Sequence, residues 1–269
     1  MSLVRLAARI SAVHALKGRL FEGTEVLDSE IGAIGLGPDG SLVAESESRF
    51  VAVYTNDGQA LIREYEPRAL HTGGTCEITF EMGITAAMLV RDPETERQQV
   101  MAGVPGTDAA FEFYLDMVGR QIMDALSDPA NDWADIWRAL CPVVVKIDRV
   151  RTDDAQQVRL AGHQIKMTCQ IVDDPVRGTE LEDGGAFSRF LLALDALGSS
   201  EADAQASLIR SALGTGAGLQ SVKRSRTLGL ADAESVALSG IEQLDEGGDP
   251  VESGTLVVEV DGIGTSEAK

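Results

Sequence analysis

Three histidines and three cysteines are the residues of this chain best suited to bind a metal ion or to act as a base or nucleophile. His71 and Cys76 flank a Gly-Gly pair, but no second pair of ligands accompanies them, so we interpret them as a loop histidine beside a strand cysteine. His163 and Cys169 share one face of an expected strand, where six residues separate them by about 20 Å, too far for a catalytic hydrogen bond. We therefore expect no metal ion, no cofactor and no catalytic residue, and we predict that the chain is not an enzyme.

Other motifs that could carry chemistry have simpler interpretations. The acid pairs Asp153-Asp154 and Asp173-Asp174 fall in expected turns, where aspartate accepts hydrogen bonds from nearby backbone amides. The glycine-rich run at 214–218 lacks the Lys-Ser or Lys-Thr that follows a phosphate-binding loop, so we interpret it as a loop. Trp133 and Trp137 share a helical stripe with apolar residues, which favours core packing over a ligand-stacking surface.

Composition excludes two further classes. The chain has 269 residues with 43 Asp and Glu against 23 Lys and Arg, a formal net charge of −20, which is the wrong sign for a free-standing nucleic-acid binder. No apolar run approaches the roughly 20 residues needed to span a bilayer, so we expect no membrane segment. Three cysteines are an odd number and lie far apart in the sequence, as in proteins that keep their thiols reduced in the cytosol.

The periodicity of apolar residues predicts an α+β fold, with an antiparallel or mixed sheet flanked by helices in the order α-β-β-β-α-α-β-β. Two finer features are expected: a turn or strand end at Asn56-Asp57-Gly58, and a β-bulge at Ala161-Gly162, where the apolar face of a strand switches. The helices begin at caps near Asp108 and Asn131 or Asp132. The expected elements are a helix at 3–16, strands at 25–28, 50–54 and 76–90, a returning strand at 98–102, helices at 108–126 and 133–140, and strands at 143–150 and 157–172.

We predict two domains. Residues 1–175 form the α+β domain, and residues 176–269 form an acidic, glycine-rich C-terminal extension or accessory domain. In this second part we expect helices at 187–197 and 204–213 and one late strand at 255–260, with loops between them.

The order of these elements resembles that of the tail terminator (tail completion) proteins of tailed bacteriophages. The resemblance begins with the helix at 3–16 running into Gly18-Arg19, followed by 26–29 and 50–55, and continues through the strand at 76–87, the helix at 108–126 and the strands at 143–150 and 157–172. It covers about residues 1–175, and the segment 173–269 departs from it because members of the family are commonly little more than the first domain.

The resemblance implies a structural virion protein of the tail or neck, assembled in the cytoplasm of the bacterial host. Such a protein forms a homohexameric ring that caps the tail tube, stops its polymerisation and joins the tail to the head. Its partners are further copies of itself, the tail tube protein and the head–tail connector or stopper protein. DNA passes through the lumen of the ring without specific binding.

Two candidate contact regions follow from this expectation. The tip of the predicted hairpin carries Asp92, Glu94 and Glu96, which could face the lumen and repel DNA phosphates or make an axial contact; a plain solvated turn is an equally good interpretation. The hairpin itself, at 84–102, is our candidate for the subunit interface. Its apolar interface candidates are Ile84, Met88, Val90 and Val100.

Two alternatives remain open at this point. One is another tail or neck component, either a tail tube protein, whose ring subunits stack into open filaments, or a connector stopper. The other is an enzyme or small-molecule-binding protein that uses a groove between the sheet and the helices. This second alternative requires a pocket with convergent polar groups, for which the sequence offers little.

Overall fold

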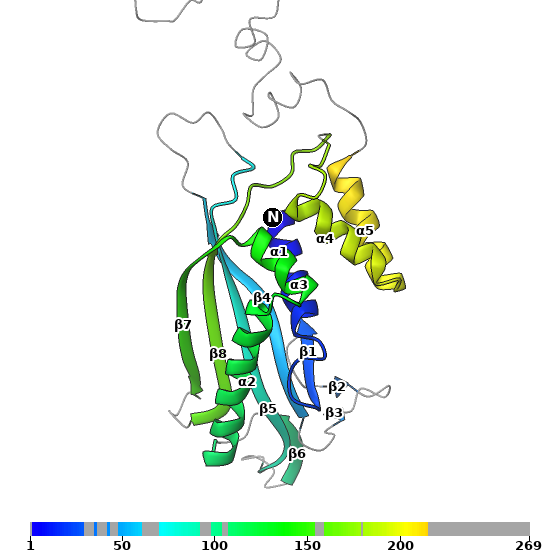
Figure 1. Cartoon of the computed structure of the whole chain (residues 1–269). Helices are drawn as coiled ribbons and strands as arrows, with labels where there is room; N and C mark the ends of the chain where they lie inside the picture. Colours follow the sequence, from blue (N-terminus) through cyan, green and yellow to red (C-terminus); the bar gives the residue numbers. More distant parts are fainter. Residues whose placement is uncertain are drawn as a thin grey trace, which may run out of the picture.

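The computed structural model describes residues 2–29, 35–36, 42–43, 48–60, 70–91, 98–103, 107–153, 159–178 and 180–214 (Figure 1). The α+β class predicted from the sequence is confirmed, because helices flank a mixed sheet in the predicted order. The elements are α1 Leu3–Leu16, β1 Thr24–Asp28, β2 Gly35–Leu36, β3 Leu42–Val43, β4 Ser48–Gln59, β5 Thr75–Arg91, β6 Gln98–Gly103, α2 Ala109–Ser127, α3 Asp132–Leu140, β7 Val143–Asp153, β8 Arg159–Gln170, α4 Ala186–Ala196 and α5 Ser200–Leu213.

The main sheet has the strand order β1-β4-β5-β8-β7, and β6 pairs with the far end of β5. β1 runs parallel to β4, and every other neighbouring pair in this sheet is antiparallel. The strands β2 and β3 form a separate two-stranded sheet. In this order β1 and β7 are the two edges of the main path, so β7 pairs with β8 on one side only among the described residues.

Two helices cover one face of the sheet. α1 packs on β1 and β4, α2 packs on β5 and β8, and the two helices touch each other. α3 packs against α1 and α2, and α4 packs on α1 and α3 with α5 beside it (Figure 1). This arrangement leaves the helix-side face of β7 with no helix across it in the described part of the chain.

The core lies between this face and the helices. Along β5 the alternate residues Ile78, Phe80 and Met82 are buried, and on β8 the residues Ile165, Met167 and Cys169 face the same layer. The α4 residues Phe187, Phe190 and Leu194 belong to this same core, so α4 is packed on the first part of the chain. Alternation with period two is what fixes the register of such strands, since a one-residue slip would expose the whole apolar set.

The ends of the helices agree with the capping residues predicted from the sequence. The carboxylate of Asp108 accepts hydrogen bonds from the amides of Ala110 and Phe111 at the start of α2. Asn131 caps α3 by accepting from the amide of Ala134. Both prolines that follow a helix, at positions 129 and 142, lie just beyond the last helical turn.

Two predicted irregularities have different outcomes. Of the turn or strand end predicted at Asn56-Asp57-Gly58, the turn is wrong, because these residues lie within β4 and form a register shift against β5, whereas β4 does end one residue later, at Gln59. The side chain of Asn56 is held across the sheet by Thr79, at 2.8 Å, instead of bonding its own backbone in a turn. On β8 the pairing with β7 shifts register between His163 and Arg159, where the sequence predicts the bulge.

Candidate functional site

Among the strand residues whose side chains the structure describes, the exposed large apolar side chains lie on the edge strand β7. Among the described residues β7 has one neighbour, and its apolar side chains are between 40% and 60% exposed. A long apolar edge strand with free backbone groups is a template for pairing with another chain, and native proteins normally cover or interrupt it. The exposed apolar residues of β7 are Val143, Val144, Val145, Ile147 and Val150.

A groove runs between α2 and β7, which we name the α2–β7 groove. It consists of two cavities that are both lined by Met123. The first, the arginine cavity, has a volume of about 490 Å³, and the second, the apolar cavity, has a volume of about 300 Å³. The groove exists because α2 lies over β5 and β8 and leaves β7 uncovered.

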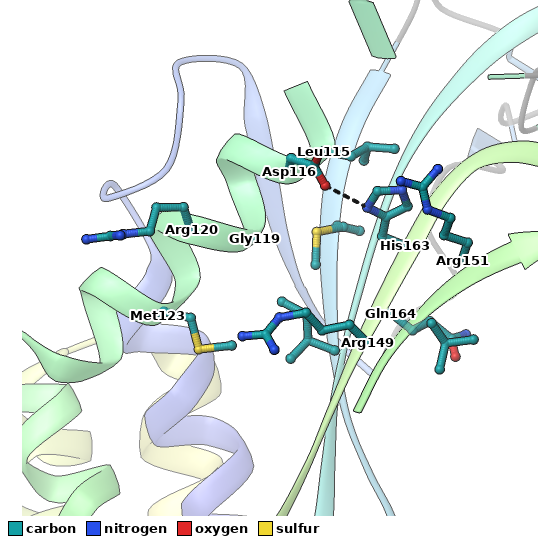
Figure 2. A pocket seen from close by; sticks show the side chains of 12 residues that line it. Leu115, Asp116, Gly119, Arg120, Met123, Arg149, Arg151, His163 and Gln164 are labelled. Carbon is teal, nitrogen blue, oxygen red and sulfur yellow. Dashed lines mark ion pairs between the residues drawn. The ribbon is translucent and has the colours of Figure 1, made fainter. Parts of the chain in front are cut away.

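The arginine cavity has an apolar floor and a polar rim (Figure 2). Met82, Leu115 and Ile165 form the floor, and α2 contributes Gly119 above them. A Cβ at Gly119 would lie 3.5 Å from the Ile165 side chain and 3.8 Å from the Met82 sulfur, which is ordinary contact. The rim is formed by Asp116, Arg120, Arg149, Arg151, His163 and Gln164.

One end of this rim is an ion-pair network centred on Glu112 of α2. Arg151 of β7 lies 2.6 Å from the Glu112 carboxylate, and His163 of β8 lies 3.2 Å from it. On its other ring nitrogen His163 is 3.8 Å from Asp116, the contact drawn in Figure 2. Partial burial alone would raise the pKa of Glu112, but the hydroxyl of Thr107 that donates to it, together with His163 and Arg151, lowers that pKa below its ordinary value.

Arg149 and Trp137 are two lining residues whose side-chain N–H groups lack a partner among the described residues. Arg149 reaches from β7 toward Met123 of α2 (Figure 2), and it has no ion pair with any residue that the structure describes. Trp137, which lines the apolar cavity, has a buried indole N–H with no acceptor in the described part of the chain. This N–H is enclosed by the protein, so Arg149 is the donor that a partner in the groove could reach.

The lining of the groove, apolar side chains together with Arg149, is chemically suited to an apolar surface that also carries acids or carbonyl oxygens. Within the described residues no group of three or more His, Cys, Asp and Glu side chains could hold a metal ion. No helix in that part of the chain is long and apolar enough to cross a membrane.

The hairpin residues predicted as the subunit interface are only partly described. Ile84 is fully buried on the core side of β5, inside its own chain. Met88 pairs with Met101, Val90 with Gln99 and Val100 with Leu89 in the β5–β6 ladder, and their role in a subunit interface stays a prediction. Asp92, Glu94 and Glu96 lie outside the described residues, so the predicted lumen contact stays a prediction.

The three cysteines, far apart in the sequence, come together in the core. Cys76 on β5 lies directly opposite Cys169 on β8, and the thiol of Cys141 hydrogen-bonds with that of Cys169. This hydrogen bond and burial raise the pKa of Cys141, and the same bond lowers the pKa of Cys169. All three are buried free thiols, and His71 does not join them in a metal site.

The paired acids have structural roles at longer range than the sequence predicts. The carboxylate of Asp174 accepts from the hydroxyl of Ser2, at 2.7 Å, and from the amide of Val4, at 2.8 Å, and so holds the start of α1. Asp173 accepts from the amide of Gly73 at 2.9 Å. Asp153 ends β7, and Asp154 lies outside the described residues.

Trp137 is a core residue as predicted, whereas Trp133 is only partly buried and stacks on His14, with 4.6 Å between ring centroids. Burial, and next the nearby charge of Lys17, lower the pKa of His14 to about 4. His14 is therefore neutral at pH 7 and acts as part of the packing between α1 and α3.

The contact between His163 and Glu112 is not predicted from the sequence, because the two residues lie 51 positions apart on different elements. The sequence does contain one indication of such a contact. His163 is the one polar residue in the apolar face that continues through Ile165 and Met167.

No protein-family model matches the chain, and no curated protein matches its sequence.

Proposed function

We propose that the chain is a structural subunit of a bacteriophage tail that forms a closed ring, most specifically a tail terminator. In this role the ring caps the tail tube, stops its polymerisation and joins the tail to the head connector. The order of helices and strands described above is the order on which the resemblance to tail terminators rests.

The observation that carries the proposal is the uncovered β7 edge with its groove. Five apolar side chains between 40% and 60% exposed, on a strand with one described neighbour, are more than a chain that works alone would leave in water. A subunit of a ring covers such a surface with its neighbour. Self-association is therefore the function that this geometry favours.

The first test is the mass of the purified chain, measured by light scattering after size exclusion, with negative-stain images of the same peak. A closed ring of about six subunits is the expected result, since rings are closed by repeated heterologous contacts. Extended tubes would instead favour the tail tube protein, and a ring that binds only the head side would favour a connector stopper.

The second test distinguishes the terminator from other rings. Tail tubes of the phage or prophage that encodes the chain are assembled with and without it, and their lengths are measured in negative stain. Tubes that stop growing and carry one extra ring at an end support the proposal. A chain that stays a monomer and also leaves tube growth unchanged refutes it.

A specific observation also favours a second candidate, a protein that binds a small apolar carboxylate. The arginine cavity, at about 490 Å³, is within the size range of ligand sites, and Arg149 on its rim has no ion-pair partner in the described chain. The test is thermal unfolding with sodium decanoate. A concentration-dependent rise in midpoint that Arg149→Gln removes supports this candidate, and equal midpoints with and without decanoate exclude it.

A further inference from the structure

A second surface with exposed apolar residues lies on the opposite flank of the molecule. The helices α4 and α5 form a hairpin that we name the α4–α5 hairpin, and Figure 1 shows it across the molecule from β7. Leu192 of α4 is 66% exposed and Leu208 of α5 is 73% exposed, although both helices bury their other apolar residues against the core. One chain cannot cover its own groove with this hairpin, because the two lie on opposite sides of the sheet's width.

The two surfaces differ in charge. The segment of β7 at 143–151 carries Lys146, Arg149 and Arg151 against the single acid Asp148, in a chain whose net charge is −20. On the hairpin the two cations, Arg189 and Arg210, are already paired with Asp135 and Asp195. On β7, Lys146 and Arg151 are likewise paired, with Asp148 and Glu112. The cation of β7 that remains without an ion pair among the described residues is therefore Arg149, and the charges that remain on the hairpin are negative.

The acids available on the hairpin are Glu201 and Asp203, in the first turn of α5. Neither forms an ion pair with a residue that the structure describes. They match Arg149 of the groove, which has no ion-pair partner among the described residues. A partner that presents leucines and carboxylates together would satisfy both the apolar and the polar part of the groove.

We propose that the α4–α5 hairpin of one copy docks in the α2–β7 groove of the next copy, so that copies join head to tail. This inference rests on the proposed ring, and it names the two surfaces that build it. A contact between two different surfaces is heterologous, and its repetition closes a ring when the rotation between copies permits. Pairing of β7 with β7 of a second copy would instead give an isolated symmetric dimer.

The test uses one variant for each surface. The hairpin variant combines Leu192→Asp with Leu208→Asp, and the groove variant combines Ile147→Asp with Arg149→Glu. All four side chains are at the surface, so far-UV circular dichroism and thermal midpoints are expected to remain those of the wild type. Phe113→Asp is the matched control, because Phe113 is an apolar residue of α2 that is 69% exposed and lies outside both cavity linings.

The molar mass of each variant alone, and of the two variants mixed, is measured by light scattering. Each variant alone is expected to be a monomer, and the Phe113→Asp control is expected to assemble like the wild type. An equimolar mixture of the two variants is expected to form a species of twice the monomer mass and nothing larger, because one intact groove meets one intact hairpin. Raised salt is expected to weaken this species, since part of the attraction is between charges.

Three results would overturn the inference. A hairpin variant that assembles like the wild type excludes the hairpin as the partner and leaves the ring proposal intact. Variants that remain monomers when mixed exclude the head-to-tail contact. A wild-type chain that is monomeric at its highest soluble concentration overturns the contact as well, while the tube-length assay still decides whether the chain is a terminator.

Discussion

Replacement of Asn131 by alanine is expected to be the most damaging single polar substitution in the helical layer. Asn131 is buried at the start of α3. Its side-chain amide donates to the carbonyls of Ala15, at 2.9 Å, and Ala125, at 3.0 Å, while its oxygen accepts from the amide of Ala134. One side chain thus connects the last turns of α1 and α2 to the first turn of α3.

The cost of Asn131→Ala follows from these three bonds. Loss of the helix cap costs about 1 kcal/mol, and each buried carbonyl left without its donor costs about 1–3 kcal/mol. The free energy of unfolding should therefore fall by about 3 kcal/mol or somewhat more, a large part of the roughly 5–15 kcal/mol of a typical domain. In urea this corresponds to a midpoint lower by roughly 1–2 M at an unchanged slope.

Two companion variants separate the contributions. Asn131→Asp keeps the cap acceptor but places a carboxylate against two carbonyl oxygens, so it should be at least as unstable as the alanine variant. Asp132→Ala changes the neighbouring exposed acid and should cost no more than about 0.3–1 kcal/mol. If Asn131→Ala lowers the free energy of unfolding by less than 1 kcal/mol, or if Asn131→Asp matches the wild type, the reasoning from these hydrogen bonds is refuted.

Three further predictions concern the groove, the stacked histidine and the thiols. Gly119→Ala should raise the free energy of unfolding by about 1 kcal/mol in urea titrations, because alanine favours the helix and its methyl group meets only ordinary contacts; a loss of stability would contradict the described packing. His14 has a folded pKa of about 4, below its ordinary 6.5, so only the unfolded chain binds a proton between these values, and stability should fall as the pH is lowered from about 6.5 to about 4. His14→Gln should flatten that part of the stability profile, and an unchanged profile would speak against the burial of His14. The three cysteines are at most 3% exposed, so a thiol reagent should label none of them quickly in the native protein and all three in denaturant.

The sequence predicts those features that depend on neighbouring residues. The caps Asp108 and Asn131 act within three residues of themselves, and the alternation along β5 shows at once which side chains face the core. The turn at Asn56-Asp57-Gly58 failed as a prediction because its usual local hydrogen bond is replaced by one to Thr79, on the neighbouring strand. A local signal is overruled there by a tertiary contact.

The groove could not have been predicted in the same way. The run Val143-Val144-Val145 indicates a strand but does not reveal that β7 is an edge, because strand order depends on pairings many residues apart. Whether α2 covers β7 or its neighbours is decided by packing of the whole helical layer. The contacts of Glu112 with His163 and Arg151 likewise require side chains from two neighbouring strands to reach one helix.

The anchoring of α1 has a consequence for how the chain folds. α1 is synthesised before the other described helices, yet its start is held by Asp174, 170 or more residues later, and its last turn by Asn131, 116 residues later. Contacts of such sequence separation are slow to form, because a long loop must close before they contribute. During synthesis the contacts that anchor α1 can therefore form only after most of the described chain has been made. Until then its apolar face is available to chaperones or to other nascent chains. We expect that truncation before residue 174 yields an aggregation-prone product, whereas loss of residues after 214 leaves these anchors of the first helix in place.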